Sequence, residues 1–263
     1  MKPDSVQRYK IIVAYDGTGF HGWQKQTDRS GQTLRTVAGV VEQTLCQALQ
    51  QPIVLVGASR TDAGVHALGQ AAHFDAETPI PVERMGHAIN SRLPADVQVM
   101  EAAIVGPDFH AIRDAAFKHY RYRIFCADRS PVHERHFAWH CWRSLDVERM
   151  ADAAGRFVGT HDFAGFAAAG HGRRSTVRSI LACRAERDGA GPLLNVIVEG
   201  DGFLYNMVRI MVGTLVEVGR GRYEPQVVEQ VLASKNRREA GPTLPPQGLF
   251  LDWINYAGVD VPR

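Results

Sequence analysis

The sequence predicts a mixed α+β fold with a mainly antiparallel or mixed sheet. Apolar residues recur at helical spacing in some segments and form short β-rich runs in others. These helices and strands alternate irregularly along the chain, which favours α+β over a regular parallel fold. Two runs flank Asp188-Gly189 and Gly191-Pro192, a pattern typical of a hairpin. With 263 residues and 45% hydrophobic content, the chain can form one large domain or two ordinary ones.

The N-terminal part predicts four strands and two helices. Tyr9–Tyr15 is a β-rich run that ends at the turn signal Asp16-Gly17. Thr36 is a plausible N-cap for a helix in which apolar residues recur every three or four positions. The predicted strands are 9–15, 53–57, 67–75 and 97–105, and the predicted helices are 37–49 and 82–92.

The C-terminal part has a looser version of the same pattern. The predicted strands are 120–126, 179–186, 193–199 and 249–254, and the predicted helices are 145–157, 203–218 and 226–233. The stretch 167–178 is rich in Gly, Ala and Arg and is predicted to be a mobile basic loop. The weak similarity between the N-terminal and C-terminal patterns predicts two related halves, 1–105 and 106–263. One irregular domain remains an alternative.

Composition limits the classes of protein. No apolar run approaches the roughly 20 residues that cross a bilayer, and the start MKPDSVQRYK lacks the apolar core of a secretory signal. A cytoplasmic protein is therefore expected. The net charge is only +2, so a bound polyanion would have to contact local patches.

The cysteines and histidines do not predict a metal centre. Cys46, Cys126, Cys141 and Cys183 form no CxxC pair, so separate, reduced and mostly buried thiols are expected. His133, His136 and His140 crowd one stretch beside Cys141, but their spacing fits no standard zinc pattern. No metal is expected.

Three segments contain residues suited to chemistry or RNA binding. Asp62 lies in the polar turn SRTDAGVH between two strands, where Arg60 would keep it ionised. On the residues alone, an Asx-turn is the favoured interpretation. Arg209 lies on an apolar helix, and its anionic partner is either a structural carboxylate or a catalytic aspartate. Tyr120 and Tyr122 alternate with Arg121 and Arg123, which suits base stacking but also an ordinary amphipathic strand.

Taken in order, eight sequence blocks resemble the tRNA pseudouridine synthase A family over nearly the whole chain. Each block alone is weak evidence, whereas the ordered set is specific. The blocks are YDGTGFHGWQ at 15–24, RTDAGVHALGQ at 60–70, INSRLPADV at 89–97, DFHA at 108–111, YRYRI at 120–124, GTHDFAGF at 159–166, GFLYNMVRIMVGTLVEVGRG at 202–221 and AGPTLPPQGLFL at 240–251.

The resemblance implies a fold, a reaction and a substrate. The family fold consists of two ferredoxin-like α/β halves with a joined, mainly antiparallel sheet and a central cleft. The implied activity is an isomerase that converts uridine to pseudouridine in the anticodon stem-loop of tRNA, at one or more of tRNA positions 38 to 40. The implied enzyme is a cytoplasmic homodimer that needs no metal or organic cofactor. The alternative is a non-catalytic tRNA-binding protein or chaperone.

The resemblance also assigns site residues. Asp62 matches the catalytic aspartate, Tyr120 the active-site tyrosine and Arg209 its arginine partner. Arg60 matches the arginine that helps to expel the target base, and Leu249 or Leu251 is expected to line the uracil pocket. The chain departs from the family pattern at Ser59, where glycine is usual, and at Ala38, where the family has TVQG.

Overall fold

The computed structural model describes residues 6–168 and 175–256. The chain divides into two compact units. One contains residues up to Ala116 together with those from Leu251 onward, and the other is Phe117–Phe250. The mixed α+β class with a mainly antiparallel sheet is confirmed in both units. No helix among the described residues is long and apolar enough to span a membrane.

In the first unit, the strand order is β4-β1-β3-β10, and β2 pairs with β3. Strand β1 lies between β3 and β4 and is antiparallel to both. Its alternate residues Tyr9, Ile11 and Val13 point to the same face of the sheet and are buried there. The bounds are β1 Gln7–Tyr15, β2 Val56–Gly57, β3 His66–Ala76, β4 Val97–Val105 and β10 Leu249–Tyr256.

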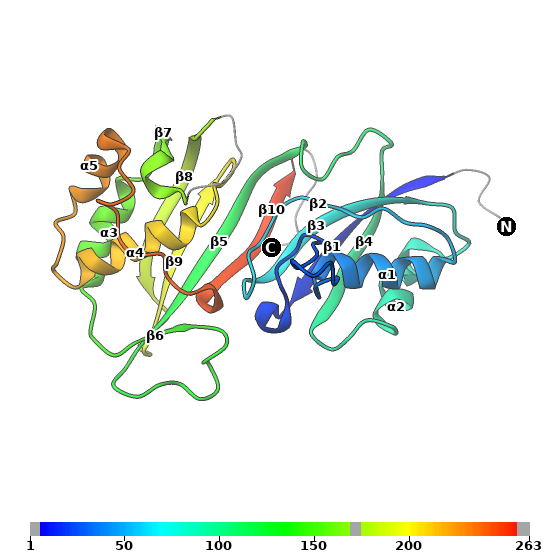
Figure 1. The fold of residues 1–263 in the computed structure, drawn as a ribbon, viewed down its shortest axis with the longest axis horizontal. Helices are drawn as coiled ribbons and strands as arrows, with labels where there is room; N and C mark the ends of the chain where they lie inside the picture. The colour runs from blue at the N-terminus through cyan, green and yellow to red at the C-terminus, as the bar shows by residue number, and fades with distance from the viewer. Residues whose placement is uncertain (1–5, 169–174, 257–263) are drawn as a thin grey trace. The chain divides into compact units, whose positions relative to one another are not determined.

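Helices α1 (Val37–Leu49) and α2 (Val82–Asn90) lie together on one face of this sheet (Figure 1). The predicted N-cap of α1 is confirmed, because the Thr36 hydroxyl accepts a hydrogen bond from the Gly39 amide at 3.3 Å. The predicted strand 53–57 is shorter than expected, and only Val56 and Gly57 pair with β3.

In the second unit, the strand order is β5-β9-β8-β7, with β6 parallel to β5. The predicted hairpin is confirmed, because β8 and β9 pair in antiparallel register. Helices α3, α4 and α5 gather on one face of the sheet (Figure 1). The bounds are β5 Ala115–Cys126, β6 Trp139–Cys141, β7 Gly159–Asp162, β8 Val177–Arg187, β9 Leu193–Gly200, α3 Val147–Gly155, α4 Met207–Gly219 and α5 Val227–Ser234. Short 3-10 helices are η1 Gly17–Gly19, η2 Phe163–Phe166 and η3 Pro246–Gly248.

The structure corrects two predictions in this unit. The apolar helix begins at Met207, not at Phe203, because Asn206 has a φ of 60° and its left-handed backbone cannot continue an α-helix. The predicted loop 167–178 is wrong at its end, since β8 already begins at Val177. Its central residues, 169–174, lie outside the described part of the chain.

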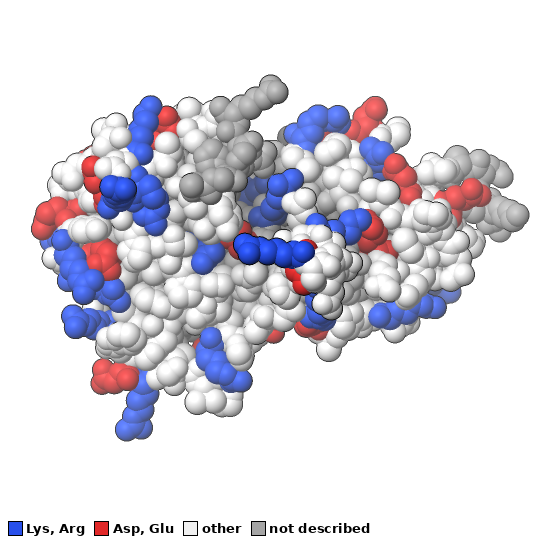
Figure 2. All heavy atoms as spheres, in the orientation of Figure 1, with Lys and Arg blue, Asp and Glu red and all other residues white. Residues whose placement is uncertain are grey.

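Charged side chains of both signs are interspersed over the face drawn in Figure 2. Neither sign forms one continuous field there, in keeping with the net charge of +2. Attraction of a polyanion to this protein must therefore depend on local groups of Lys and Arg.

Candidate active site

The polar loop between β2 and β3 presents Arg60 and Asp62. Its first residues are fixed by the fully buried side chain of Gln70 on β3. The Gln70 Nε2 donates to the Ser59 carbonyl at 2.6 Å, and its Oε1 accepts from the Ser59 amide at 3.2 Å. This bidentate contact imitates a strand ladder and fixes the direction in which the chain leaves β2.

A second segment, Asp16–Trp23, packs directly against this loop. The Trp23 amide donates to the Thr61 carbonyl at 3.1 Å, and the Gly64 amide donates to the Phe20 carbonyl at 3.3 Å. The Tyr15 and Thr61 hydroxyls share a buried hydrogen bond of 2.7 Å. Thr61 is therefore held inward, while Asp62 is half-buried and Arg60 is exposed.

Two glycines in this segment permit the close approach. A Cβ atom on Gly17 would lie 2.0 Å from the Val65 carbonyl oxygen, and one on Gly22 would lie 2.6 Å from the Thr61 carbonyl oxygen. Gly22 also has a φ of +87°, a conformation that side chains disfavour. The YDGTGFHGW block therefore packs closely against the Asp62 loop and supports it.

His66 reinforces the same junction from the first position of β3. Its ring is buried, and Nδ1 accepts a hydrogen bond from the Gly17 amide at 3.1 Å. The carboxylate of Asp16 lies 3.2 Å from the same nitrogen. The two contacting residues lie in the motifs DGTG and GVH, which are visible in the sequence. That these motifs lie next to each other is seen only in the folded chain.

The departures from the family pattern fit the backbone. Ser59 is absent from the described residues with positive φ, so replacing glycine there introduces no left-handed strain. Ala38 is a buried residue in the first turn of α1, where its amide donates to the Trp23 carbonyl at 3.0 Å.

In the second unit, Tyr120 and Tyr122 lie on β5 and are both buried. The Tyr120 ring meets the Phe203 ring edge-on, with centroids 5.0 Å apart. The Tyr122 hydroxyl donates to the Pro245 carbonyl at 2.7 Å. Burial raises the pKa of Tyr122 well above its usual range, and the positive charge of Arg209 opposes that shift.

Arg209 lies in the first turn of α4, where its side chain joins two segments. Its Nε donates to the Leu244 carbonyl at 2.7 Å, and its Nη1 donates to the Asn206 side-chain oxygen at 2.7 Å. The Leu244 amide in turn donates to the Arg209 carbonyl at 3.3 Å. These contacts fix the guanidinium in one orientation. Asn206 itself lies just before the helix, as its N-cap.

Leu249 and Leu251 are both buried on β10 and point to the same side of that strand. Phe250 between them lies under two cations of β5, with the guanidinium carbons of Arg121 and Arg123 at 5.6 and 6.0 Å from its ring centroid. Arg123 also forms a 3.1 Å ion pair with Glu134. These arginines are therefore not simply solvated, as an ordinary amphipathic strand would have them.

The predicted site residues thus fall into two groups, and each group is held by contacts within its own unit. Arg60 and Asp62 belong to the supported loop of the first unit, and Tyr120 and Arg209 belong to the second unit. Among the described residues, no three His, Cys, Asp or Glu side chains are close enough to hold a metal ion. In the histidine-rich stretch 133–141, Nε2 of His140 forms a hydrogen bond with the Ala127 carbonyl at 2.8 Å.

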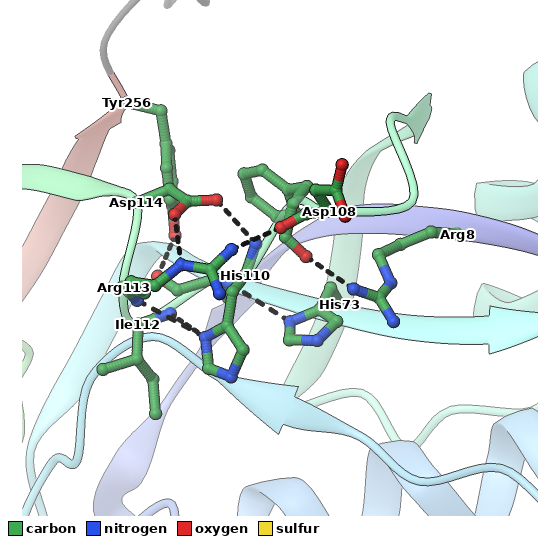
Figure 3. Close-up of polar contacts among 10 residues, drawn as sticks. Arg8, His73, Asp108, His110, Ile112, Arg113, Asp114 and Tyr256 are labelled. Carbon is green, nitrogen blue, oxygen red and sulfur yellow. Dashed lines mark hydrogen bonds and ion pairs between the residues drawn. The ribbon is translucent and has the colours of Figure 1, made fainter.

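A second polar cluster lies in the first unit, around the DFHA block (Figure 3). Nδ1 of the buried His73 accepts from the Ala111 amide at 3.2 Å, and the Tyr256 hydroxyl donates to the Ala111 carbonyl at 2.8 Å. Arg8 donates to the Phe109 carbonyl at 2.9 Å and also holds the Asp75 carboxylate through two bonds of 2.7 Å. The block therefore has a structural role in anchoring the chain that leaves β4.

Comparison with known proteins identifies the class. A family model described as tRNA pseudouridine synthase matches residues 11–113 and 153–257. The chain belongs to this family and is therefore an isomerase.

Individual relatives agree over nearly full length, and each is named tRNA pseudouridine synthase A. The protein from Moorella thermoacetica is 45% identical over 94% of this chain and 98% of its own length. The protein from Limosilactobacillus fermentum is 44% identical over 95% of this chain and 96% of its own. The protein from Acetivibrio thermocellus is 41% identical over 95% of this chain and 100% of its own. The family resemblance drawn from the sequence blocks is confirmed.

Proposed function

We propose that this protein converts uridine to pseudouridine in the anticodon stem-loop of tRNA, with Asp62 as the catalytic nucleophile. The proposal rests on one observation in a member of this family: the segment Asp16–Trp23 packs against the Asp62 loop and holds it in place. Thr61 is held inward by Tyr15 and Trp23, so the neighbouring carboxylate is presented from a rigid loop. A preorganised reactive group loses little entropy when the substrate binds.

The proposed site draws on both halves of the chain. The half 1–105 supplies Asp62 and Arg60, and the half 106–263 supplies Tyr120 and Arg209. Arg209 would favour the ionised form of Asp62 by opposite charge. Tyr120 would stack on the target base, and Leu249 or Leu251 would line the uracil pocket.

The reaction is a balanced isomerisation that needs no oxidant or reductant. The bond between uracil N1 and ribose C1′ breaks, and a bond between uracil C5 and C1′ forms. The proton that C5 loses is released, and N1 gains one from solvent. As a nucleophile, Asp62 would attack either C1′ of the ribose or C6 of the base. The alternative chemical role is that of a base that removes the C2′ proton. Enclosure of the detached uracil makes its reattachment effectively intramolecular.

Access to the glycosidic bond requires the target nucleotide to leave the stack. Arg60 is exposed next to Asp62, so it is suited either to fill the vacated space or to contact a phosphate. Either role would lower the cost of the flipped state. We also propose that the enzyme acts in the cytoplasm as a homodimer whose subunits contact one tRNA.

Replacement of Asp62 by Asn tests the catalytic assignment. The amide keeps the size of the side chain but has neither the charge nor the basicity that each of the three chemical roles needs. We expect at least a thousand-fold loss of tritium release from tRNA labelled at C5 of uridine, with tRNA binding within about threefold of the wild-type protein.

The control is Asp188→Asn, which makes the same change at an exposed carboxylate in the turn between β8 and β9 and should keep the wild-type rate of tritium release. Wild-type rates of tritium release from Asp62→Asn would overturn the assignment. Failure of the wild-type protein itself to release tritium from any tRNA would instead favour the non-catalytic tRNA-binding alternative.

A further inference from the structure

Two cysteines outside the proposed site are brought together by the parallel pairing of β5 and β6. Cys126 and Cys141 are register partners at the ends of these strands. Neighbouring strands lie about 4.8 Å apart, which is within the Cα separation of about 4.4–6.8 Å that a disulfide spans. The expectation of reduced, unlinked thiols is confirmed for all four cysteines, but Cys126 and Cys141 lie side by side and not apart.

The two sulfurs share a polarised environment. A hydrogen bond from Cys126, together with Arg220, lowers the pKa of Cys141 to about 5. The same hydrogen bond, and then burial, raise the pKa of Cys126. The Arg220 Nη2 donates to the Cys141 sulfur at 3.6 Å, so a cation faces the sulfur that carries the negative charge.

The two cysteines differ in exposure. Cys126 is half-buried, whereas Cys141 is 1% exposed, so only a small oxidant is expected to reach its sulfur. The remaining cysteines lack this arrangement. Cys183 is buried, and burial raises its pKa to about 12. Cys46 is tied to the backbone of Ile53, whose amide donates to its sulfur at 3.3 Å.

We propose that Cys126 and Cys141 form a redox-active dithiol that a peroxide converts into an intramolecular disulfide. The Cys141 thiolate, which faces Arg220, attacks one oxygen of hydrogen peroxide and becomes a sulfenic acid. The second oxygen leaves as hydroxide and takes up a proton to give water. The Cys126 thiol then attacks the sulfenic sulfur of Cys141, and its proton joins the departing hydroxyl to give a second water.

The balance is two thiols and one peroxide to one disulfide and two waters, so the peroxide is the only co-reactant. The disulfide would enclose residues 127–140 in a covalent loop. It would also remove the negative charge from the sulfur that faces Arg220. Because both changes lie within the second unit, the oxidised state needs no partner chain. A dithiol of this kind is reset by a small thiol reductant.

The test uses the full-length protein, first fully reduced and then freed of reductant. After brief treatment with hydrogen peroxide and alkylation of remaining thiols, we expect reactive thiols under denaturing conditions to fall from four to two. Peptide mapping without reduction should show Cys126 linked to Cys141 within one chain, and dithiothreitol should restore all four thiols. Four persistent thiols, or a link between two chains only, would overturn the proposal.

Single substitutions separate the two sulfurs. In Cys126→Ser, the sulfenic acid at Cys141 should persist because the second thiol is missing, and dimedone present during denaturation should label it. In Cys141→Ser, the labelling of Cys126 should be at least tenfold lower, because the sulfur that faces Arg220 is missing. Cys46→Ser is the matched control and should form the disulfide at the wild-type rate. Equal dimedone labelling of the two single variants would contradict the assigned order of attack.

Discussion

At the scale of single residues, His73 couples protonation to the fold (Figure 3). Burial lowers its pKa from 6.5, with Arg8 and His110 adding to that shift while Asp75 and Asp114 oppose it. The neutral ring is also what accepts the Ala111 amide through Nδ1. Protonation at this nitrogen would remove an acceptor and place a charge in the core.

The stability of the protein should therefore decrease as the pH falls below about 6.5. In that range the unfolded chain binds a proton at His73 that the folded chain does not, so the free energy of unfolding falls with falling pH. One such site contributes a slope of at most about 1.4 kcal/mol per pH unit. Urea unfolding between pH 7.5 and 5 measures it.

The variant His73→Asn isolates this contribution, because its side-chain oxygen can replace Nδ1 as an acceptor but does not titrate. We expect a shallower pH dependence than in the wild-type protein over the same range. The Asp75 carboxylate, whose pKa Arg8 lowers from 3.8, affects stability only in more acidic solution. An unchanged slope in the variant would show that His73 is not responsible.

At the scale of elements, the support of the Asp62 loop depends on how closely two segments approach. Gly22 and Gly31 offer a matched comparison, since their φ angles are +87° and +83°. A Cβ atom on Gly22 would meet the Thr61 carbonyl at 2.6 Å, whereas one on Gly31 would meet nothing within 4 Å. The two positions differ in contact but not in backbone strain.

We expect Gly31→Ala to cost about 1–2 kcal/mol of stability, from the left-handed backbone alone. Gly22→Ala should cost a further 1–3 kcal/mol or so, because the two loops must separate. It should also reduce tritium release at least tenfold in protein that remains folded, since the displaced residues adjoin Asp62. Thermal unfolding and the tritium assay measure the two effects. Equal losses for the two variants would contradict the supporting role.

The same segments show what sequence reasoning can and cannot predict. Periodicity predicted α1 and β4 closely, because apolar spacing and a good N-cap are local properties. It misplaced the start of α4, because the left-handed Asn206 leaves no mark in an apolar pattern. It also missed β6, whose three residues form a strand only through pairing with β5.

The candidate site divides in the same way. Asp62, Tyr120 and Arg209 were assigned by resemblance to a family, and residue chemistry alone left each with a structural alternative. The contacts that hold these residues in place join distant parts of the sequence. Gln70 and Ser59 are 11 positions apart, and Leu244 and Arg209 are 35 positions apart. Contacts of that separation follow from the tertiary fold and not from local spacing.

At the scale of the whole molecule, a net charge of +2 must be reconciled with a polyanionic substrate. Affinity for RNA depends on the phosphates that are neutralised locally and not on the total charge. Three phosphate contacts would give a slope of about −2.7 in a plot of log affinity against log salt. We therefore expect tRNA affinity to fall roughly 40-fold between 50 and 200 mM salt.

The same measurement decides between the two roles proposed for Arg60. If its guanidinium contacts a phosphate, Arg60→Gln should make the slope shallower by about 1 unit. If it instead fills the space left by the flipped base, the slope should stay unchanged while tritium release falls. Asp62→Asn serves as the control, because loss of its charge should not make the slope shallower. Fluorescence anisotropy with labelled tRNA at five or more salt concentrations gives both slopes, and an affinity insensitive to salt would contradict phosphate-driven binding altogether.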